Sequence, residues 1–151
     1  MGFYSATDFE PDCSVGYLVR RVHQLTQAGL EPVFAAEGLT NIQWHALISI
    51  FFGRGVTPAG LARDLSYDKG ATTRLLDVLE ARGWVLRERG PDDRRSVRLT
   101  LTREGEAVTR RARMKLIDAW NDWLADWPHE EVAAAVATLQ RLRDTLAEKV
   151  R

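Results

Sequence analysis

A change of hydrophobic period between residues 57 and 101 constrains the fold of this chain more than any other feature. Thr57 followed by Pro58 has the pattern of an N-cap and a proline in the first helical turn, and Asp68 has the pattern of a second N-cap. A two-residue turn separates the two expected helices, and the second runs to about Arg82, just before a glycine. Two helices joined by so short a turn predict a helix-turn-helix.

The residues that follow alternate between apolar and polar, which is the period of a half-buried β-strand. Two alternating segments, residues 84–89 and 96–101, flank a turn rich in glycine, proline and aspartate at residues 90–93. They predict a two-stranded hairpin with one half-buried face. A hairpin directly after a helix-turn-helix is a wing, and the tip of this wing carries Arg94 and Arg95.

Helical patterns precede this central region. The first helix is expected to begin near Ser14 and to run to about Glu37, with an interruption around Gly29–Pro32. Thr40 and Gln43 have the spacing of a capping box at the start of the next helix.

Two more helical patterns follow the wing. Thr102 is expected to cap a helix with two glutamates in its first turn, and Pro128 to start the last helix. Both carry long apolar stripes, made of Val108, Ala112, Leu116, Ala119, Trp120, Trp123 and Leu124 in one and Val132, Val136, Leu139, Leu146 and Val150 in the other. The expected fold class is mainly α with a small β-hairpin wing.

The charge distribution is uneven although the formal net charge is zero. Residues 54–115 hold 15 Lys/Arg and 9 Asp/Glu, and the rest of the chain holds 6 Lys/Arg and 12 Asp/Glu. The middle of the chain therefore has a net charge of +6 and the two ends together −6. Such a field steers a polyanion toward the middle of the chain, unless the clustering is a matter of chance.

Other features limit the class and compartment of the protein. No stretch approaches the roughly 18 apolar residues of a membrane span, and the first residues show no secretory signal. Cys13 is the only cysteine, so a reducing cytoplasm is the expected compartment. The three histidines are dispersed along the chain. The sequence shows no phosphate-binding glycine loop, no nucleophile elbow and no Cys/His metal spacing, so it indicates neither an enzyme nor a bound metal or cofactor.

The helix expected from Lys69 to about Arg82, called the reading helix below, has two different faces. One face is expected to be buried and carries Ala71, Leu75, Val78 and Leu79, with Leu76 at its edge. The outer face carries Lys69, Gly70, Thr73, Arg74 and Asp77. A small, basic and hydroxylic outer face suits entry into a major groove about 12 Å wide.

Individual residues of this face have distinct expected roles. Lys69 or Arg74 could donate to guanine acceptors, and Thr73 could contact a thymine methyl or a phosphate. Gly70 lowers helix stability but would allow close approach to the duplex. A solvated amphipathic helix is the alternative for this segment taken alone.

The wing tip favours the DNA interpretation. Arg94 and Arg95 follow Asp93, and an arginine on an exposed hairpin tip can enter a narrow, A/T-rich minor groove. A charged polar turn is the alternative for the tip alone. A helix-turn-helix, a basic outer face and an arginine-tipped hairpin in this order are much less common by chance.

The sequence from Asp68 to Glu106 resembles the core of the MarR family of regulators. The family's wing pattern, Asp-x-Arg followed after five residues by Leu-Thr, is matched by Asp93, Arg95, Leu101 and Thr102, and its LT-x-x-Q segment by Leu39, Thr40 and Gln43. The order of elements is matched over nearly the whole chain. The resemblance implies a winged helix-turn-helix at 38–102, between dimerisation helices at 1–37 and 103–151.

The resemblance also implies a function and a set of contacts. The chain would be a homodimeric transcriptional regulator, a repressor, on pseudo-palindromic double-stranded DNA, with two reading helices roughly 34–36 Å apart. The residues facing the major groove would be Lys69, Gly70, Thr73 and Arg74. Arg95, held by Asp93, would face the minor groove, with Arg94 beside it on a phosphate.

Oxidation of a cysteine releases some members of this family from DNA. Cys13 lies about where the peroxide-sensing branch keeps its reactive cysteine, and a thiol near a helix N-terminus can be reactive. However, Leu30 and Asn41 stand where that branch has two supporting tyrosines. An inert lone cysteine is the alternative.

A small aromatic or phenolic acid is the other effector that the resemblance suggests. Arg20 could supply a cation for the carboxylate, and His23 and Trp44 could line the pocket. Each residue has a simpler alternative, because Arg20 could be solvated, His23 could lack a partner and Trp44 could belong to the core.

Two further classes of protein stay open from the sequence. The chain could be a winged-helix protein-interaction module, in which the five tryptophans build a recognition surface. Three of them, Trp120, Trp123 and Trp127, have helical spacing and first indicate a core or dimer stripe. A winged-helix family with different helix packing is the second alternative.

Overall fold

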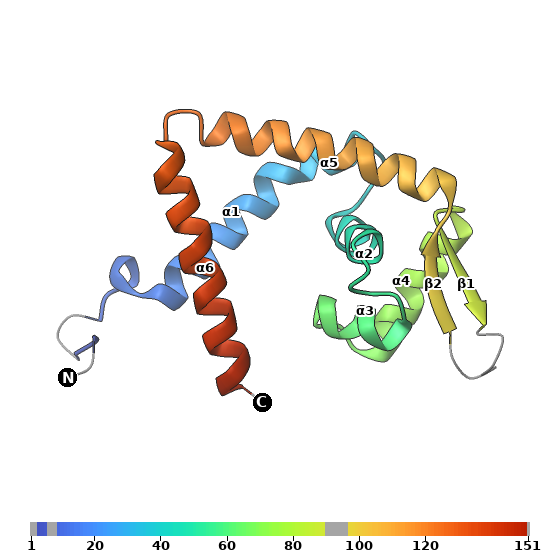
Figure 1. Cartoon of the computed structure of the whole chain (residues 1–151), viewed down its shortest axis with the longest axis horizontal. Coiled ribbons are helices and arrows are strands. Elements are labelled where there is room, and N and C mark those ends of the chain that lie inside the picture. The colour runs from blue at the N-terminus through green and yellow to red at the C-terminus, as the bar shows by residue number, and fades with distance from the viewer. Residues whose placement is uncertain (1–2, 6–8, 90–96, 151) are drawn as a thin grey trace. The chain divides into compact units, whose positions relative to one another are not determined.

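The computed structural model describes residues 3–5, 9–89 and 97–150 (Figure 1). Its α-helices are α1 (Val15–Ala35), α2 (Asn41–Phe51), α3 (Pro58–Leu65), α4 (Lys69–Ala81), α5 (Arg103–Trp123) and α6 (His129–Lys149), and a short 3-10 helix, η1 (Pro11–Cys13), precedes them. The strands β1 (Val85–Arg89) and β2 (Val97–Leu101) stand between α4 and α5. The predicted mainly helical fold with a β-hairpin is confirmed.

The chain divides into two compact units, residues 1–116 and 117–151. The first unit holds α1 to α4, the hairpin and most of α5, and the second holds the end of α5 and all of α6. The functional division into 1–37, 38–102 and 103–151 is a separate matter and stays a prediction.

The capping box predicted at the start of α2 is present. The Thr40 hydroxyl accepts a hydrogen bond from the Gln43 backbone N–H at 3.4 Å, and the Thr40 N–H donates to Gln43 Oε1 at 3.0 Å. These two bonds satisfy polar groups that a helix start leaves open. Their presence explains why this boundary could be located from a spacing of three residues.

The other predicted caps also form. The Thr57 hydroxyl accepts from the backbone of Gly60 at 3.0 Å, and Asp68 Oδ1 accepts from Ala71 at 2.8 Å. Thr102 caps α5 in the same way, accepting from Gly105 at 2.9 Å. Each cap involves atoms only three residues apart, so the boundaries of α3, α4 and α5 are encoded locally.

The interruption predicted around Gly29–Pro32 is wrong, because α1 continues through Pro32 to Ala35. Proline has no N–H to donate to the carbonyl four residues earlier, which belongs to Ala28. Both Ala28 and Pro32 are exposed, so water can solvate that carbonyl. Leu30 and Phe34 are buried on the other side of the helix and keep it in place.

The core of the first unit is made by one side of each helix and of the hairpin. Phe34 of α1 stacks on Trp44 of α2, with ring centroids 5.5 Å apart. The fully buried large side chains are Phe34, Leu47, Leu61, Leu76, Leu79, Leu99, Val85, Thr72 and Thr109. They come from α1, α2, α3, α4, both strands and α5, so this core holds the helix-turn-helix and the wing in one body.

The hairpin has the register that the alternation predicts. Val85 pairs with Leu101, Arg87 with Leu99 and Arg89 with Val97. Val85 and Leu99 are buried, whereas Leu86 on the opposite face of the sheet is exposed. One face of the wing is therefore packed against the helices, and it carries an arginine, Arg87, in the middle.

The start of α5 approaches the base of the hairpin closely. A Cβ atom placed on Gly105 would lie 2.0 Å from the Trp84 backbone oxygen. Thr102 strengthens this junction, because its hydroxyl donates to the Gly83 carbonyl at 2.6 Å and its N–H donates to the Trp84 carbonyl at 3.0 Å. Only glycine fits at position 105 without displacing backbone.

The second unit consists of two helical segments joined by a short turn. Trp120 and Trp123 contact each other edge to face, with ring centroids 5.3 Å apart. None of the described residues of α6 is buried, and Val136, Leu139 and Leu146 are about half exposed. Among the described residues, no helix is both long and apolar enough to cross a membrane.

Candidate nucleic-acid interface

Helix α4 is the reading helix, and it buries a face slightly different from the predicted one. Thr72, Leu75, Leu76 and Leu79 are buried, with the spacing i, i+3, i+4, i+7 of a single helix face. Leu76 is 1% exposed, so it lies at the centre of the buried face rather than at its edge. Val78, predicted to be buried, is 45% exposed. The prediction missed Thr72, whose hydroxyl donates to the Asp68 carbonyl and so can be buried.

The four residues predicted to face the major groove are all exposed on the first turns of α4. These residues are Lys69, Gly70, Thr73 and Arg74. Asp68 caps the helix with its acidic side chain. Its carboxylate accepts a hydrogen bond from the backbone N–H of Ala71, and this bond holds the pKa of the Asp68 carboxyl below its ordinary value. The Asp68 carboxylate is therefore engaged in a hydrogen bond at the start of α4.

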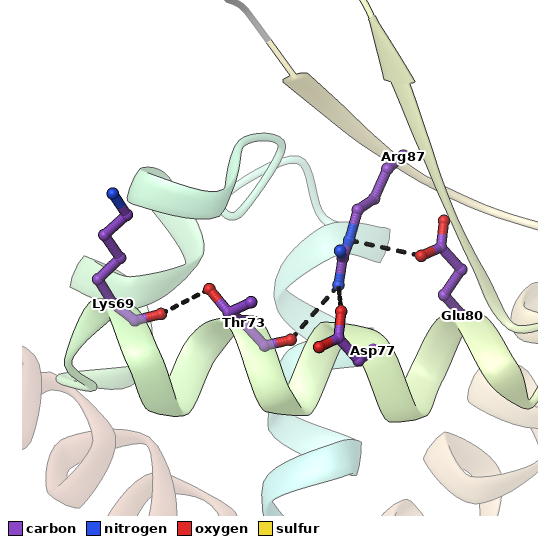
Figure 2. Close-up of polar contacts among 5 residues, drawn as sticks. All are labelled: Lys69, Thr73, Asp77, Glu80 and Arg87. Atoms are coloured by element: carbon purple, nitrogen blue, oxygen red, sulfur yellow. Dashed lines mark hydrogen bonds and ion pairs between the residues drawn. The ribbon is translucent and has the colours of Figure 1, made fainter.

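Figure 2 shows how the Thr73 side chain is used within the helix. Its hydroxyl donates to the Lys69 carbonyl at 2.8 Å (Figure 2). With its single proton engaged there, this hydroxyl can accept a hydrogen bond but has none to donate to a phosphate oxygen. The geometry favours the first of the two predicted roles for Thr73, the contact with a thymine methyl through its own methyl group.

A polar side chain of the wing also contacts α4. Arg87 of β1 extends to the helix, where its Nη2 lies 2.5 Å from Asp77 Oδ1 and donates to the Thr73 carbonyl at 3.4 Å (Figure 2). Its Nε lies 3.7 Å from Glu80 Oε2. Arg87 thus joins the wing to the reading helix next to the residues expected to contact bases.

Sequence reasoning did not select Arg87. A signal was available in the alternation, because Arg87 occupies the same face of the hairpin as the buried Val85. An arginine in the middle of a half-buried face must find partners on the element packed against it. Which carboxylates these are depends on how α4 packs against the strands, and that packing is tertiary.

The residues predicted for the wing tip, Asp93, Arg94 and Arg95, lie outside the described residues. Their proposed minor-groove contacts therefore stay predictions. At the described ends of the two strands, Arg89 and Arg98 are both exposed, which continues the basic character of the hairpin.

The three residues predicted for a ligand site line different parts of the described structure. His23 lines an open groove of about 1180 Å³ in the first unit, formed by α1, α2 and α3. Trp44 is 4% exposed and stacks on Phe34 in the core, and Arg20 lines a separate small depression on α1 with Tyr17. Of the three predicted residues, His23 is the one placed in this groove.

The groove has a chemistry that was not apparent from the sequence. It is lined by His23, Gln27, Thr40, Asn41, Ile42, His45, Ile48, Ser49, Phe52, Arg54, Asp64, Leu65 and Tyr67. Two lining atoms, Asn41 Oδ1 and Ser49 Oγ, are buried without a hydrogen-bond partner among the described residues. Burial lowers the pKa of His45, the charge of His23 lowers it further, and Asp64 opposes these effects.

Cys13 is exposed and lies in η1, directly before α1. Leu30, at one position where the peroxide-sensing branch has a tyrosine, is buried, and Asn41 is half-buried. A redox role for Cys13 stays a prediction. Among the described residues, no cluster of His, Cys, Asp and Glu could hold a metal ion.

Sequence comparisons point to one family. A profile of the MarR family matches residues 39–97. The chain is similar to the multiple antibiotic resistance protein MarR of Escherichia coli (strain K12), with 37% identity over 94 residues, 62% of this chain and 65% of that protein. It is also similar to the HTH-type transcriptional regulator PecS of Dickeya dadantii (strain 3937), with 31% identity over 143 residues, 92% of this chain and 85% of PecS. The match to MarR thus spans somewhat less than two thirds of that relative.

Solved structures agree in fold. A mutant of MarR from E. coli complexed with operator DNA superposes with a TM-score of 0.74 and 31% identity, covering 85% of this chain and 92% of that chain. CouR from Rhodococcus jostii RHA1, bound to p-coumaroyl-CoA, superposes with a TM-score of 0.76 and 25% identity, covering 88% and 94%. The predicted winged helix-turn-helix fold is therefore confirmed.

Proposed function

This chain belongs to the MarR family, and from that premise we propose that it is a transcriptional repressor that binds operator DNA as a homodimer. The prediction that the chain is not an enzyme is confirmed, because its family consists of transcriptional regulators. Membership also excludes the alternative of a winged-helix family with different helix packing.

The observation that carries the proposal is the outer face of α4. Lys69, Gly70, Thr73 and Arg74 are exposed in its first turns, while the opposite face is buried in the core. In a helix-turn-helix, the N-terminal residues of the second helix contact base edges in the major groove. A mutant of E. coli MarR, whose fold is similar, has been crystallised with operator DNA.

The apolar faces of the terminal helices support the homodimer. On α1, Val15, Leu18, Val22 and Leu25 are each between 42% and 56% exposed in the single chain. On α6, Val136, Leu139 and Leu146 are about half exposed. Exposed apolar side chains at helical spacing mark an interface on each of these helices, and we propose that a second copy of the chain covers them.

A salt-dependent DNA titration tests the proposed function. The purified protein is titrated with the intergenic DNA upstream of its own gene and with unrelated DNA of equal length, while sedimentation measures its oligomeric state. A dimer that prefers the upstream DNA, and whose affinity falls as salt rises, supports the proposal. Folded protein that binds neither DNA at low salt contradicts it and favours the protein-interaction module.

A matched pair of variants locates the interface. Arg74→Gln on α4 is expected to weaken specific binding by about 1–3 kcal/mol, the scale of a lost guanine contact. Arg143→Gln on α6, which removes an exposed ion pair with Asp144, is expected to leave DNA affinity unchanged. Equal effects of the two changes would place the DNA elsewhere than on α4.

A second proposed property is release by a small aromatic acid bound in the groove that His23 lines. Ser49 Oγ and Asn41 Oδ1, buried and without a hydrogen-bond partner in the described ranges, are polar atoms that a ligand or water could satisfy. The relative CouR has been crystallised with p-coumaroyl-CoA, an aromatic ligand. Ile48, Phe52 and other apolar residues supply a surface for a ring.

Calorimetry with simple phenolic acids tests this second property. Heat of binding that is lost in Ser49→Ala, together with release of operator DNA, supports a ligand in the groove. Arg20→Ala, which changes a side chain outside the groove, is the control and is expected to bind the acid as the wild type does. Absence of both heat and DNA release from the wild-type protein contradicts the proposal.

A further inference from the structure

Among the described residues, Arg87 is the one whose charged side chain joins the wing to the reading helix. Its Nη2 contacts Asp77 Oδ1 at 2.5 Å, and its Nε lies 3.7 Å from Glu80 Oε2 (Figure 2). The same Nη2 donates to the Thr73 carbonyl at 3.4 Å. A single guanidinium therefore reaches three successive turns of α4.

The two carboxylates that Arg87 contacts stand on the exposed side of α4. The side chains of Asp77 and Glu80 are 58% and 43% exposed, whereas that of Arg87 is 27% exposed. Asp77 follows Thr73 by four residues, so the two side chains are neighbours on the helix surface. Without a cation beside it, the Asp77 carboxylate would repel the phosphates of DNA brought to this face.

The strand fixes where the Arg87 cation lies. Arg87 pairs across the hairpin with the buried Leu99, and Val85 on the same face is also buried. The guanidinium can reach α4 because this face of the hairpin packs against the helices. Arg87 Nε is buried and has no hydrogen-bond partner within the described part of the chain, since Glu80 is at ion-pair distance only.

We propose that Arg87 is a positioning residue for operator recognition, which holds the wing against the reading helix and neutralises Asp77 so that Thr73 and Arg74 can approach the bases. This inference rests on the proposed DNA-binding function. Arg87 acts through Asp77, and it makes no direct contact with DNA. Lysine is a poor substitute, because its ammonium is a single point of charge whereas the planar guanidinium contacts several groups at once.

A double-mutant cycle separates this role from a direct phosphate contact. Four proteins are titrated over a range of salt: the wild type, Arg87→Gln, Asp77→Asn and the double variant. The operator probe is the upstream intergenic DNA used to test the proposed function, and unrelated DNA of equal length is the comparison. Arg87→Gln is expected to weaken operator binding by about tenfold, because it leaves Asp77 unpaired beside the DNA. In the double variant the affinity is expected to return to within about threefold of the wild type.

The coupling is the decisive quantity in this cycle. Asp77→Asn is expected to increase affinity in the Arg87→Gln background and not in the wild-type background. The slope of log affinity against log salt is expected to stay constant in Arg87→Gln, since no phosphate contact is lost. A direct phosphate contact would instead reduce that slope by about 1 and give additive effects.

Two controls accompany the cycle. Arg89→Gln, two residues further along the same strand and exposed, is expected to show no coupling with Asp77→Asn. Arg87→Lys keeps the charge, and it is expected to restore part of the affinity while folding like the wild type by circular dichroism. If Arg87→Gln itself unfolds, Arg87→Lys and Asp77→Asn form a second cycle, in which a smaller coupling of the same sign is expected because lysine keeps the charge but loses the guanidinium contacts.

Each outcome decides the inference. Additive effects of Arg87→Gln and Asp77→Asn, or a loss of slope in Arg87→Gln, overturn the positioning role while wild-type operator binding keeps the proposed function. A wild-type protein that does not prefer operator DNA overturns the proposed function, and the positioning role falls with it. Coupling with a constant slope establishes Arg87 as a positioning residue.

Discussion

At the scale of single residues, the reading helix shows that exposure alone does not define a contact. Thr73 is exposed, but its hydroxyl proton is engaged by the Lys69 carbonyl. If Thr73 contacts DNA, the group that it can offer is therefore its methyl, which can pack on the methyl of a thymine. The sequence allowed either a methyl or a hydroxyl role, and the internal hydrogen bond favours the methyl.

A pair of substitutions tests whether Thr73 contacts DNA through its methyl group. Thr73→Val keeps the methyl and is expected to leave operator affinity within about twofold of the wild type. Thr73→Ser keeps the hydroxyl and loses the methyl, so it is expected to cost about 0.8 kcal/mol, roughly a fourfold loss of affinity. Affinity is measured by fluorescence anisotropy on operator DNA. The reverse order of the two variants would show that the hydroxyl makes the contact.

At the scale of elements, the wing is held at its base by backbone and at its middle by Arg87. The base depends on the close approach of α5 at Gly105 to the Trp84 carbonyl, and on the hydrogen bonds of Thr102. Leu99 also donates from its backbone to the Val56 carbonyl at 2.8 Å, which ties β2 to the segment before α3. Contacts within the chain itself therefore fix the two described strands of the wing against the helices.

Gly105→Ala is expected to destabilise this junction. The added Cβ would lie 2.0 Å from the Trp84 oxygen, so the helix or the strand must move, at a cost of about 3 kcal/mol in unfolding free energy. Urea denaturation followed by circular dichroism measures the change. Gly16→Ala is the control, because the nearest atom to its added Cβ lies 4.0 Å away. A Gly105→Ala protein as stable as the wild type would contradict the close packing.

The wing tip carries a prediction that rests on the sequence alone. Arg95→Glu is expected to abolish operator binding while leaving the dimer intact, because a carboxylate would be repelled by the minor groove that the arginine is expected to enter. Binding is measured by gel shift and the dimer by sedimentation. Arg143→Glu on α6 serves as the charge-matched control, and unchanged affinity of Arg95→Glu would show the wing assignment to be wrong.

At the scale of the whole molecule, an ion-pair cluster joins the end of the first helix to the fifth. Glu37, whose side chain is 9% exposed, accepts from Arg111 Nε at 2.9 Å and pairs with Lys115 Nζ at 2.7 Å. Glu37 and Arg111 are 74 residues apart in sequence. These contacts fasten α1, which we propose to be part of the dimer interface, to the helix that follows the wing.

The same cluster predicts how stability depends on acid. The hydrogen bonds from Lys115 and then Arg111 hold the pKa of Glu37 below its ordinary value of 4.5. A depressed folded-state pKa stabilises the protein above the ordinary value, and this contribution is lost as pH falls through the folded-state pKa. Glu37→Gln is expected to cost about 1 kcal/mol at neutral pH. Denaturation curves from pH 7 to pH 3 measure the difference.

The shape of the two curves distinguishes the outcomes. The gap in stability between the wild type and Glu37→Gln is expected to narrow below pH 4.5 as the Glu37 carboxylate gains a proton. Glu148→Gln, which changes an exposed glutamate near the end of α6, is the control. A gap that stays constant with pH would show that the Glu37 charge does not contribute to folding.

Most of the fold could be predicted because its signals are local. The caps of α2, α3, α4 and α5 each join atoms three residues apart, and the hairpin follows from a period of two. The same locality explains the placement of Lys69, Gly70, Thr73 and Arg74 on an outer face, since one helix determines it. The predicted interruption at Pro32 was wrong because the rule that proline breaks a helix considers only neighbours in sequence. Burial of Leu30 and Phe34 in the core keeps this part of α1 helical.

The sequence by itself thus determined the order of the elements, their boundaries and the outer face of the reading helix. Tertiary structure decided which side of α4 is most deeply buried, and it brought Arg87 to Asp77 and Glu37 to Lys115. It also buried Trp44 in the core and left Asn41 Oδ1 and Ser49 Oγ in the groove without a hydrogen-bond partner among the residues that the structure describes. The physical reason is range, because caps and periods act within a few residues whereas charge pairing and burial depend on which distant segments pack together.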